Sequence, residues 1–160
     1  MIKLLLPLVV LSFIACQHKE SIPNDAAARA SGRYIVQTYI VNGDTLYSSK
    51  GVNRIGVSVF YILVDRKKSD SVRVGSVYKK NGDAGSITHI KDVGVSENNG
   101  VFQLSAELRT PELYESKITN NSFYERSAKG GPSVVVIPPG YSFKKSDDPA
   151  QEGVVISAQR

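Results

Sequence analysis

Most of the chain alternates between apolar and polar side chains with a period of two residues, as in a β-strand that packs on one face. Residues 101–108 show this most clearly, with an apolar side chain at every second position. Similar segments, or short runs rich in valine, isoleucine and tyrosine, occupy residues 33–41, 45–47, 55–64, 72–78, 86–95, 122–126, 133–137, 141–144 and 154–157. Asn-Gly pairs at 42–43, 81–82 and 99–100 are typical of tight hairpin turns. The pattern predicts roughly eight to ten short strands joined mainly by tight turns.

This element order predicts an all-β fold, an antiparallel meander that is either closed as a small barrel or folded as a β-sandwich. The most hydrophobic stretch of the predicted domain is 55–64, and its unbroken part 60–64 predicts a central strand covered on both faces. Residues 66–71 are expected to form a polar loop, and Gly94 to interrupt or bulge the strand around it.

The only predicted helix is short. Thr110 is a suitable N-cap and Pro111 suits the first helical turn. Leu113, Tyr114 and Ile118 give it little apolar support, so one or two turns are expected.

The first fifteen residues have the pattern of a secretory signal peptide. Lys3 supplies a positive start, residues 4–14 form an apolar run, and Ala15 is a small residue at the end. The run is too short to cross a bilayer, which takes about 20 apolar residues. Residues 1–15 are therefore expected to be removed.

The end of this segment, Phe13-Ile14-Ala15-Cys16, resembles the lipobox of bacterial lipoproteins. The resemblance implies cleavage before Cys16, a diacylglyceryl thioether on its sulfur, and a fatty acyl chain such as palmitate on the new amino group. A single acyl chain binds membranes only marginally, whereas two or three on one residue anchor a protein stably. Cys16 is also the only cysteine, so no disulfide can form within the chain.

The residues after Cys16 bear on localisation. No aspartate follows Cys16, so the best-known signal for retention in the inner membrane is missing. Lys19-Glu20 is similar to signals that send some lipoproteins to the cell surface. An outer-membrane lipoprotein is expected, on the periplasmic or the surface face. Residues 16–31 are expected to be the lipidated cysteine and a flexible tether, followed by a single β domain at 32–160.

The start of the domain carries a second resemblance. Gly32-Arg33-Tyr34-Ile35-Val36, with Tyr39 and Asn42-Gly43-Asp44, is similar to the first hairpin of small lipocalin-like bacterial lipoproteins. The resemblance implies an up-and-down barrel that holds a small apolar ligand.

The formal net charge of +5 changes this interpretation little. The basic residues form short clusters at 66–68, 79–80 and 144–145, each at the end of an apolar run. Such clusters indicate solvated loops, or adhesion to an acidic polymer of the envelope. Nucleic acid is not an expected partner in this compartment.

The sequence has no clear catalytic or metal-binding pattern. Of the two histidines, His18 lies in the expected tether and His89 in a strand, too few for a zinc site with three or four ligands. Residues 81–86 with Asp92 resemble a calcium loop only loosely and are expected to be a plain turn. The carboxylate pairs, Asp65 with Asp70 and Asp147 with Asp148, fall in polar loops and are expected to be solvated. No cofactor is expected.

Two functions are compatible with the sequence. The first is a non-enzymatic envelope lipoprotein whose barrel binds a small apolar ligand or an envelope component. The second is a structural or protein-interaction β-sandwich on the cell envelope. The sequence assigns Cys16 to lipidation and leaves the ligand-binding residues unassigned.

Overall fold

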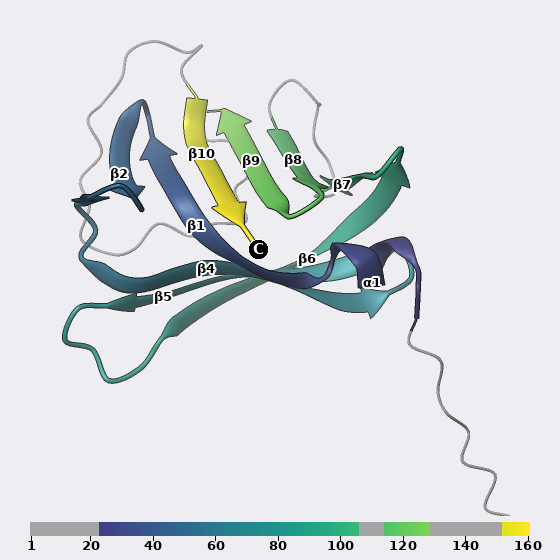
Figure 1. Ribbon diagram of the computed structural model, residues 1–160, viewed down its shortest axis with the longest axis horizontal. Helices are drawn as coiled ribbons and strands as arrows, with labels where there is room; N and C mark the ends of the chain where they lie inside the picture. The colour runs from purple at the N-terminus through teal and green to yellow at the C-terminus, as the bar shows by residue number, and fades with distance from the viewer. Residues whose placement is uncertain (1–22, 106–113, 129–151) are drawn as a thin grey trace, which may run out of the picture.

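A computed structural model describes residues 23–105, 114–128 and 152–160 (Figure 1). Within these ranges the chain forms one short helix and ten strands. In chain order they are α1 (Ala26–Ala30), β1 (Gly32–Val41), β2 (Asp44–Ser48), β3 (Val52–Asn53), β4 (Val57–Lys68), β5 (Ser71–Lys80), β6 (Ile87–Asn98), β7 (Val101–Ser105), β8 (Tyr114–Thr119), β9 (Ser122–Ala128) and β10 (Glu152–Gln159). In the described ranges, no helix has the length and apolar character needed to cross a membrane.

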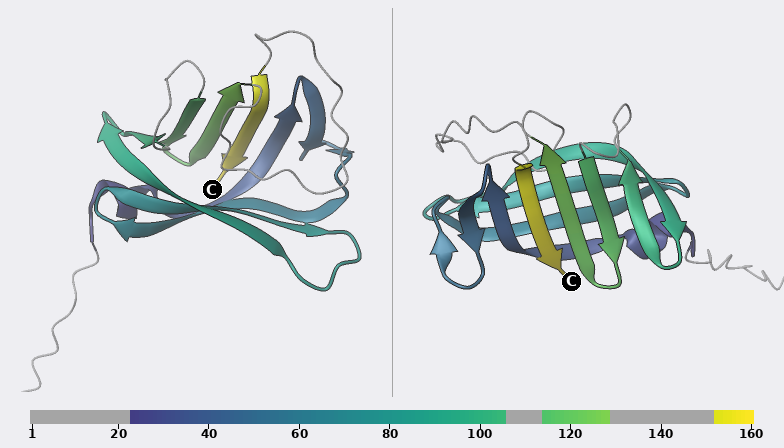
Figure 2. Two further views of the ribbon diagram at one scale, coloured as in Figure 1. Left: turned by 180° about the vertical axis from the view of Figure 1, so that it is seen from behind. Right: turned by 90° about the horizontal axis from the view of Figure 1, so that it is seen from above.

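The strands close into an antiparallel barrel of eight (Figures 1 and 2). The sheet runs β10-β9-β8-β7-β6-β5-β4-β1, and β10 pairs again with β1 to complete the ring. β2 and β3 extend from the second half of β1, beyond the part of β1 that pairs with β4. The prediction of an all-β barrel is confirmed, and the sandwich alternative is excluded.

The hairpin turns use residues that tolerate a left-handed backbone. Asn42 and Gly43 have φ values of 49° and 80°, and Asn99 and Gly100 have 51° and 77°. Two consecutive positive φ angles define the type I′ turn, whose twist matches the flanking strands. The Asn-Gly pairs therefore predicted these two hairpins correctly.

A bulge in β1 decides which of its side chains enter the barrel. The register of β1 against β10 shifts between Val36 and Thr38, so that one extra residue is inserted. Tyr34 and Val36 face inward before the bulge, and Tyr39 and Val41 after it; all four are buried. Without the bulge, Tyr39 would point to the outside.

The wall of the barrel is one sheet thick, which corrects the prediction for residues 60–64. Phe60, Ile62 and Val64 are buried inside the barrel, whereas Tyr61 and Leu63 are only partly buried outside. The Arg33 guanidinium lies 3.9 Å from the centre of the Tyr61 ring and covers part of it. This cover comes from a neighbouring side chain, and no second layer of described strands lies over β4.

Helix α1 corrects the prediction that the tether continues to Ser31. Ala27 and Ala30 are fully buried in the core, where their small side chains let the helix approach the barrel closely. The Asp25 carboxylate caps the helix by accepting a hydrogen bond from the Ala28 amide at 2.9 Å. Residues 25–31 thus belong to the folded domain, while residues 1–22 lie outside the described ranges.

Ion pairs attach the same helix to the ends of two strands. Arg66 at the end of β4 forms a two-pronged hydrogen bond with Asp25, with its Nη2 atom 2.7 Å from Oδ2. Arg29 pairs with Glu97 near the end of β6. The Tyr34 hydroxyl of β1 donates a buried hydrogen bond of 2.8 Å to the Ala30 carbonyl. Three separate strands therefore hold α1 against one end of the barrel.

Other local predictions also change. The helix expected after Thr110 is wrong over its second half, because Tyr114–Thr119 is strand β8; residues 106–113 lie outside the described ranges. The polar loop at 66–71 shrinks to a tight turn, since β4 reaches Lys68 and β5 begins at Ser71. β6 continues through Gly94, which pairs with Ser105 of β7. Predicted strands 133–137 and 141–144 lie outside the described residues.

Candidate ligand-binding interior of the barrel

Polar side chains point into the barrel from several strands. The regular alternation of β5 places Ser76 and Tyr78 on the same inner face as its buried valines. The inward polar residues are Tyr39 of β1, Ser76 and Tyr78 of β5, Ser116 of β8, and Glu125 and Ser127 of β9. None of the six is more than 1% exposed. This set is the interior polar cluster.

Five hydroxyls of the interior polar cluster have no hydrogen-bond partner within the described parts of the chain: those of Tyr39, Ser76, Tyr78, Ser116 and Ser127. A buried hydroxyl without a partner costs about 1–3 kcal/mol of folding free energy. Buried polar groups are therefore usually satisfied by protein, water or ligand. Five such groups in one interior indicate a place where a polar guest or ordered water completes the hydrogen bonding.

The strand order sets the hydroxyls on opposing walls. β5 and β9 are four places apart in the ring of eight strands and so face each other across the interior. On the other side of the ring, Ser116 pairs with Glu125, Glu125 with Ile156, and Ile156 with Tyr39. The interior polar cluster is therefore spread over opposing walls of the barrel and does not lie on a single strand.

Burial keeps the tyrosines of the interior polar cluster neutral. Desolvation raises the pKa of Tyr39 well above its ordinary value, and the nearby Glu125 carboxylate and Tyr78 raise it further. Burial also raises the pKa of Tyr78. Both phenols thus remain protonated at neutral pH, where each can donate one hydrogen bond and accept another.

Aromatic rings line the wall formed by β1, β4, β5 and β6. The Phe60 ring meets Tyr39 edge-on at 5.5 Å between centroids and Tyr78 at 6.4 Å. His89 stacks on Tyr78 at 6.0 Å with an interplanar angle of 22°. This aromatic row (Tyr39, Phe60, Tyr78 and His89) carries two of the unsatisfied hydroxyls, those of Tyr39 and Tyr78. It also gives His89, predicted only as a strand residue, a packing role.

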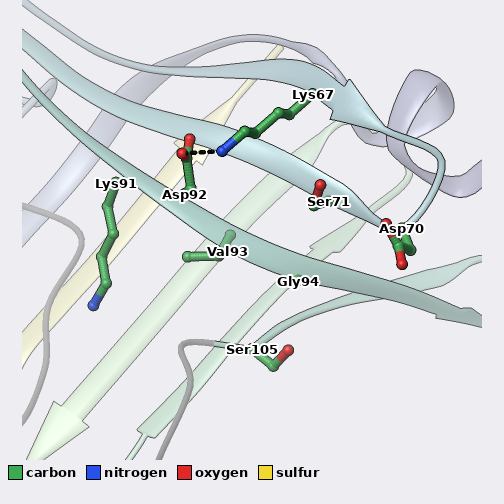
Figure 3. A pocket seen from close by; sticks show the side chains of 8 residues that line it. All are labelled: Lys67, Asp70, Ser71, Lys91, Asp92, Val93, Gly94 and Ser105. Atoms are coloured by element: carbon green, nitrogen blue, oxygen red, sulfur yellow. Dashed lines mark hydrogen bonds and ion pairs between the residues drawn. The ribbon is translucent and has the colours of Figure 1, made fainter.

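A separate pocket of about 580 Å³ lies where β7 parts from β6 (Figure 3). The β6–β7 pairing begins only at Gly94 and Ser105, which leaves the first half of β6 without a described strand on that side. The lining residues are Lys67, Asp70, Ser71, Lys91, Asp92, Val93, Gly94 and Ser105.

Charges in this pocket largely cancel. The Lys67 ammonium bonds to Asp92, as the dashed line in Figure 3 marks, and Arg73 lies 3.3 Å from the other oxygen of the same carboxylate. These bonds, that of Lys67 above all, hold the pKa of Asp92 below its usual value. Exposed ion pairs of this kind contribute little to stability. The two lysines of the lining are balanced by its two aspartates, so the pocket carries little net charge. The pocket therefore has weaker grounds for a specific ligand than the interior polar cluster.

The residues singled out from the sequence do not gather into a site. Cys16, Asp147 and Asp148 lie outside the described ranges. Asp65 is exposed on β4, and Asp83 is exposed after the turn at Gly82, whose φ is 87°. Across the described ranges, no three histidine, cysteine, aspartate or glutamate side chains lie close enough to hold a metal ion.

The described surface exposes few large hydrophobic residues. Its exposed large hydrophobic residues are Ile35, Ile87 and Ile90. Ile35 is on β1, and β4 and β5 separate it from β6, which carries the other two. An interface usually needs a contiguous apolar centre, which three separated isoleucines do not form.

Comparisons with protein-family models, with curated proteins and with solved structures found no significant match.

Proposed function

We propose that this protein is a non-enzymatic lipoprotein of the outer membrane, anchored through Cys16, whose barrel interior binds a small molecule. The observation that carries the proposal is the set of five buried hydroxyls that lack partners among the described residues. A barrel of eight strands has an interior just large enough for side chains or one small ligand. Filling such an interior with apolar side chains would avoid the cost of these hydroxyls, so their presence favours binding over a purely structural role.

The position of α1 supports an orientation relative to the membrane. Asp25 is nine residues after Cys16, and nine residues span at most about 32 Å when extended. The end of the barrel that α1 contacts would then lie near the bilayer. The opposite end, with the β1–β2 turn at Asn42, would face away from it.

The anchor is tested by replacing Cys16. Native protein is expected in the membrane fraction, with an intact mass that equals residues 16–160 plus acyl groups. Cys16→Ala should abolish both, while Ser21→Ala, a nearby substitution in the same segment, should change neither. An unmodified polypeptide mass for the native protein would refute the anchor and leave the compartment without support.

Binding is tested by native mass spectrometry of the full chain released gently from membranes. A small molecule should accompany the protein and be lost on denaturation. If no small molecule is found and none of a varied set of probes binds, the barrel is not a carrier.

A further inference from the structure

The interior polar cluster also indicates which chemical groups a ligand needs, because the ligand has to form hydrogen bonds with its side chains. Hydroxyl groups of serine and tyrosine each donate one hydrogen bond and accept others. A partner that satisfies several of them must itself both donate and accept. Hydrocarbons and simple alkyl chains do neither, and they would leave the hydroxyls as unsatisfied as before.

The charge of the ligand follows from what the lining lacks. An ion taken out of water needs an opposite charge within hydrogen-bonding distance. Five of the six buried side-chain atoms without a hydrogen bond in the described structure are neutral hydroxyls, the sixth being one oxygen of Glu125, and burial raises the pKa of both tyrosines. Glu125, the one acid of the cluster, already interacts with another residue of the chain. Neutral hydroxyls can bond fully to an uncharged guest, whereas they supply no opposite charge to a buried carboxylate.

The shape of the ligand follows from the walls. The aromatic row occupies β1, β4, β5 and β6, with Phe60 between Tyr39 and Tyr78. β8 and β9, which carry Ser116, Glu125 and Ser127, stand across the ring from β4 and β5. Aromatic rings attract flat faces and C–H edges, while unsatisfied hydroxyls lie on both walls, on β1 and β5 as well as on β8 and β9. A molecule held between them needs a flat apolar face against Phe60 and hydrogen-bonding groups that reach both walls.

We infer that the barrel takes an uncharged ligand that carries several hydroxyl or amide groups and a flat apolar face. This inference rests on the proposed function, since it names the ligand class for the same interior. Tyr39, Ser116 and Ser127 bind the polar groups, and Phe60 contacts the apolar face. The ligand class differs from the purely apolar one that the sequence resemblance implied.

The test compares two probes on the full chain by titration calorimetry: phenyl β-D-glucoside, which has a ring and several hydroxyls, and n-butylbenzene, which has only the ring and a chain. The probe variant is Tyr39→Phe/Ser116→Ala/Ser127→Ala, which removes three hydroxyls and almost no volume. The control variant is Tyr61→Phe/Ser96→Ala, which removes two hydroxyls from the outer face. Thermal unfolding of each variant confirms that it is folded.

Wild type and control should bind phenyl glucoside, and the triple variant should bind it at least about tenfold more weakly, the effect of one lost hydrogen bond or more. Molecules extracted from native protein should be uncharged and rich in hydroxyl or amide groups, and should be missing from the triple variant.

Other outcomes separate the two proposals. Tight binding of butylbenzene with none of the glucoside, or extraction of a fatty acid or hydrocarbon, would overturn the ligand class and leave the carrier function standing. Equal glucoside binding by wild type and triple variant would also overturn it, because the site would lie elsewhere. No binding of either probe together with no extracted molecule would remove the carrier function itself.

Discussion

Substitutions of two tyrosines on β1 can measure how much one hydrogen bond contributes to holding α1 in place. Tyr34 and Tyr39 are both fully buried, yet only Tyr34 has a hydrogen-bond partner among the described residues. Its hydroxyl donates to the Ala30 carbonyl, in the last turn of α1, at 2.8 Å. Replacing Tyr34 with phenylalanine keeps the ring and its contact with Phe123, whose centroid is 6.2 Å away, and removes only the hydroxyl.

Tyr34→Phe should lower the free energy of unfolding because it leaves the Ala30 carbonyl without its hydrogen-bond donor. A buried carbonyl that loses its donor forfeits about 1–2 kcal/mol of stability. In a domain of this size, each kcal/mol lowers the melting temperature by about 4 °C. Tyr34→Phe should therefore melt about 4–8 °C below wild type. In protein stripped of ligand, Tyr39→Phe should lie within about 0.5 kcal/mol of wild type or above it, because its hydroxyl has no bond to lose.

The assay is urea unfolding followed by circular dichroism, with hydrogen exchange of the amides of Ala28 and Arg29 as a local probe of α1. Tyr61→Phe serves as the control, since its ring stays beneath Arg33 and its hydroxyl is outside the barrel. Equal stability of Tyr34→Phe and wild type, with unchanged exchange in α1, would refute the account of helix docking.

Two further predictions concern the same domain. The hydrogen bonds from Arg66 lower the pKa of Asp25 in the folded protein. Their contribution to folding stability is therefore present above the unfolded pKa near 4 and is lost as the pH falls through the lower folded value. Asp25→Asn should make stability fall less steeply than in wild type below pH 4, and an equally steep fall in both proteins would contradict this. A β-carbon at Gly94 would lie 2.8 Å from the hydroxyl oxygen of Ser105, an exposed side chain that can turn away. Gly94→Ala should therefore cost less than about 1 kcal/mol, and Ser105→Ala should remove that cost in a double-mutant cycle. Additive effects of the two substitutions would show that the contact is not the cause.

The sequence predicted the wall of the barrel well because the wall depends on local signals. Alternation fixes which side chains face inward, and Asn-Gly pairs fix the turns at Asn42 and Asn99. Closure of the ring was left open, since pairing of β1 with β10 joins residues more than a hundred positions apart. The bulge that turns Tyr39 inward also has no signature in the sequence.

Helix α1 and the interior polar cluster were missed for different reasons. Five residues are too few to show a helical period, and Ala27 and Ala30 gain their stability from packing rather than from propensity. Ser76 and Tyr78 do share the inner face in the alternation of β5, which was a usable signal. What sequence alone could not supply was Ser116 and Ser127 approaching from β8 and β9 on the far wall.

The contrast between Tyr34 and Tyr39 also bears on why the interior is polar at all. Around Tyr34 the local interactions all stabilise the fold: the ring packs against Phe123, and the hydroxyl is hydrogen-bonded to helix α1. Around Tyr39 the fold accepts buried hydroxyls that apolar side chains of equal size would avoid. Proteins break local rules of this kind mostly at functional sites, where the cost is recovered when the site is filled. A ligand bound only to the folded barrel would recover it by stabilising that state in proportion to its occupancy. The stability of this domain should then rise most steeply with the one class of molecule that satisfies those hydroxyls.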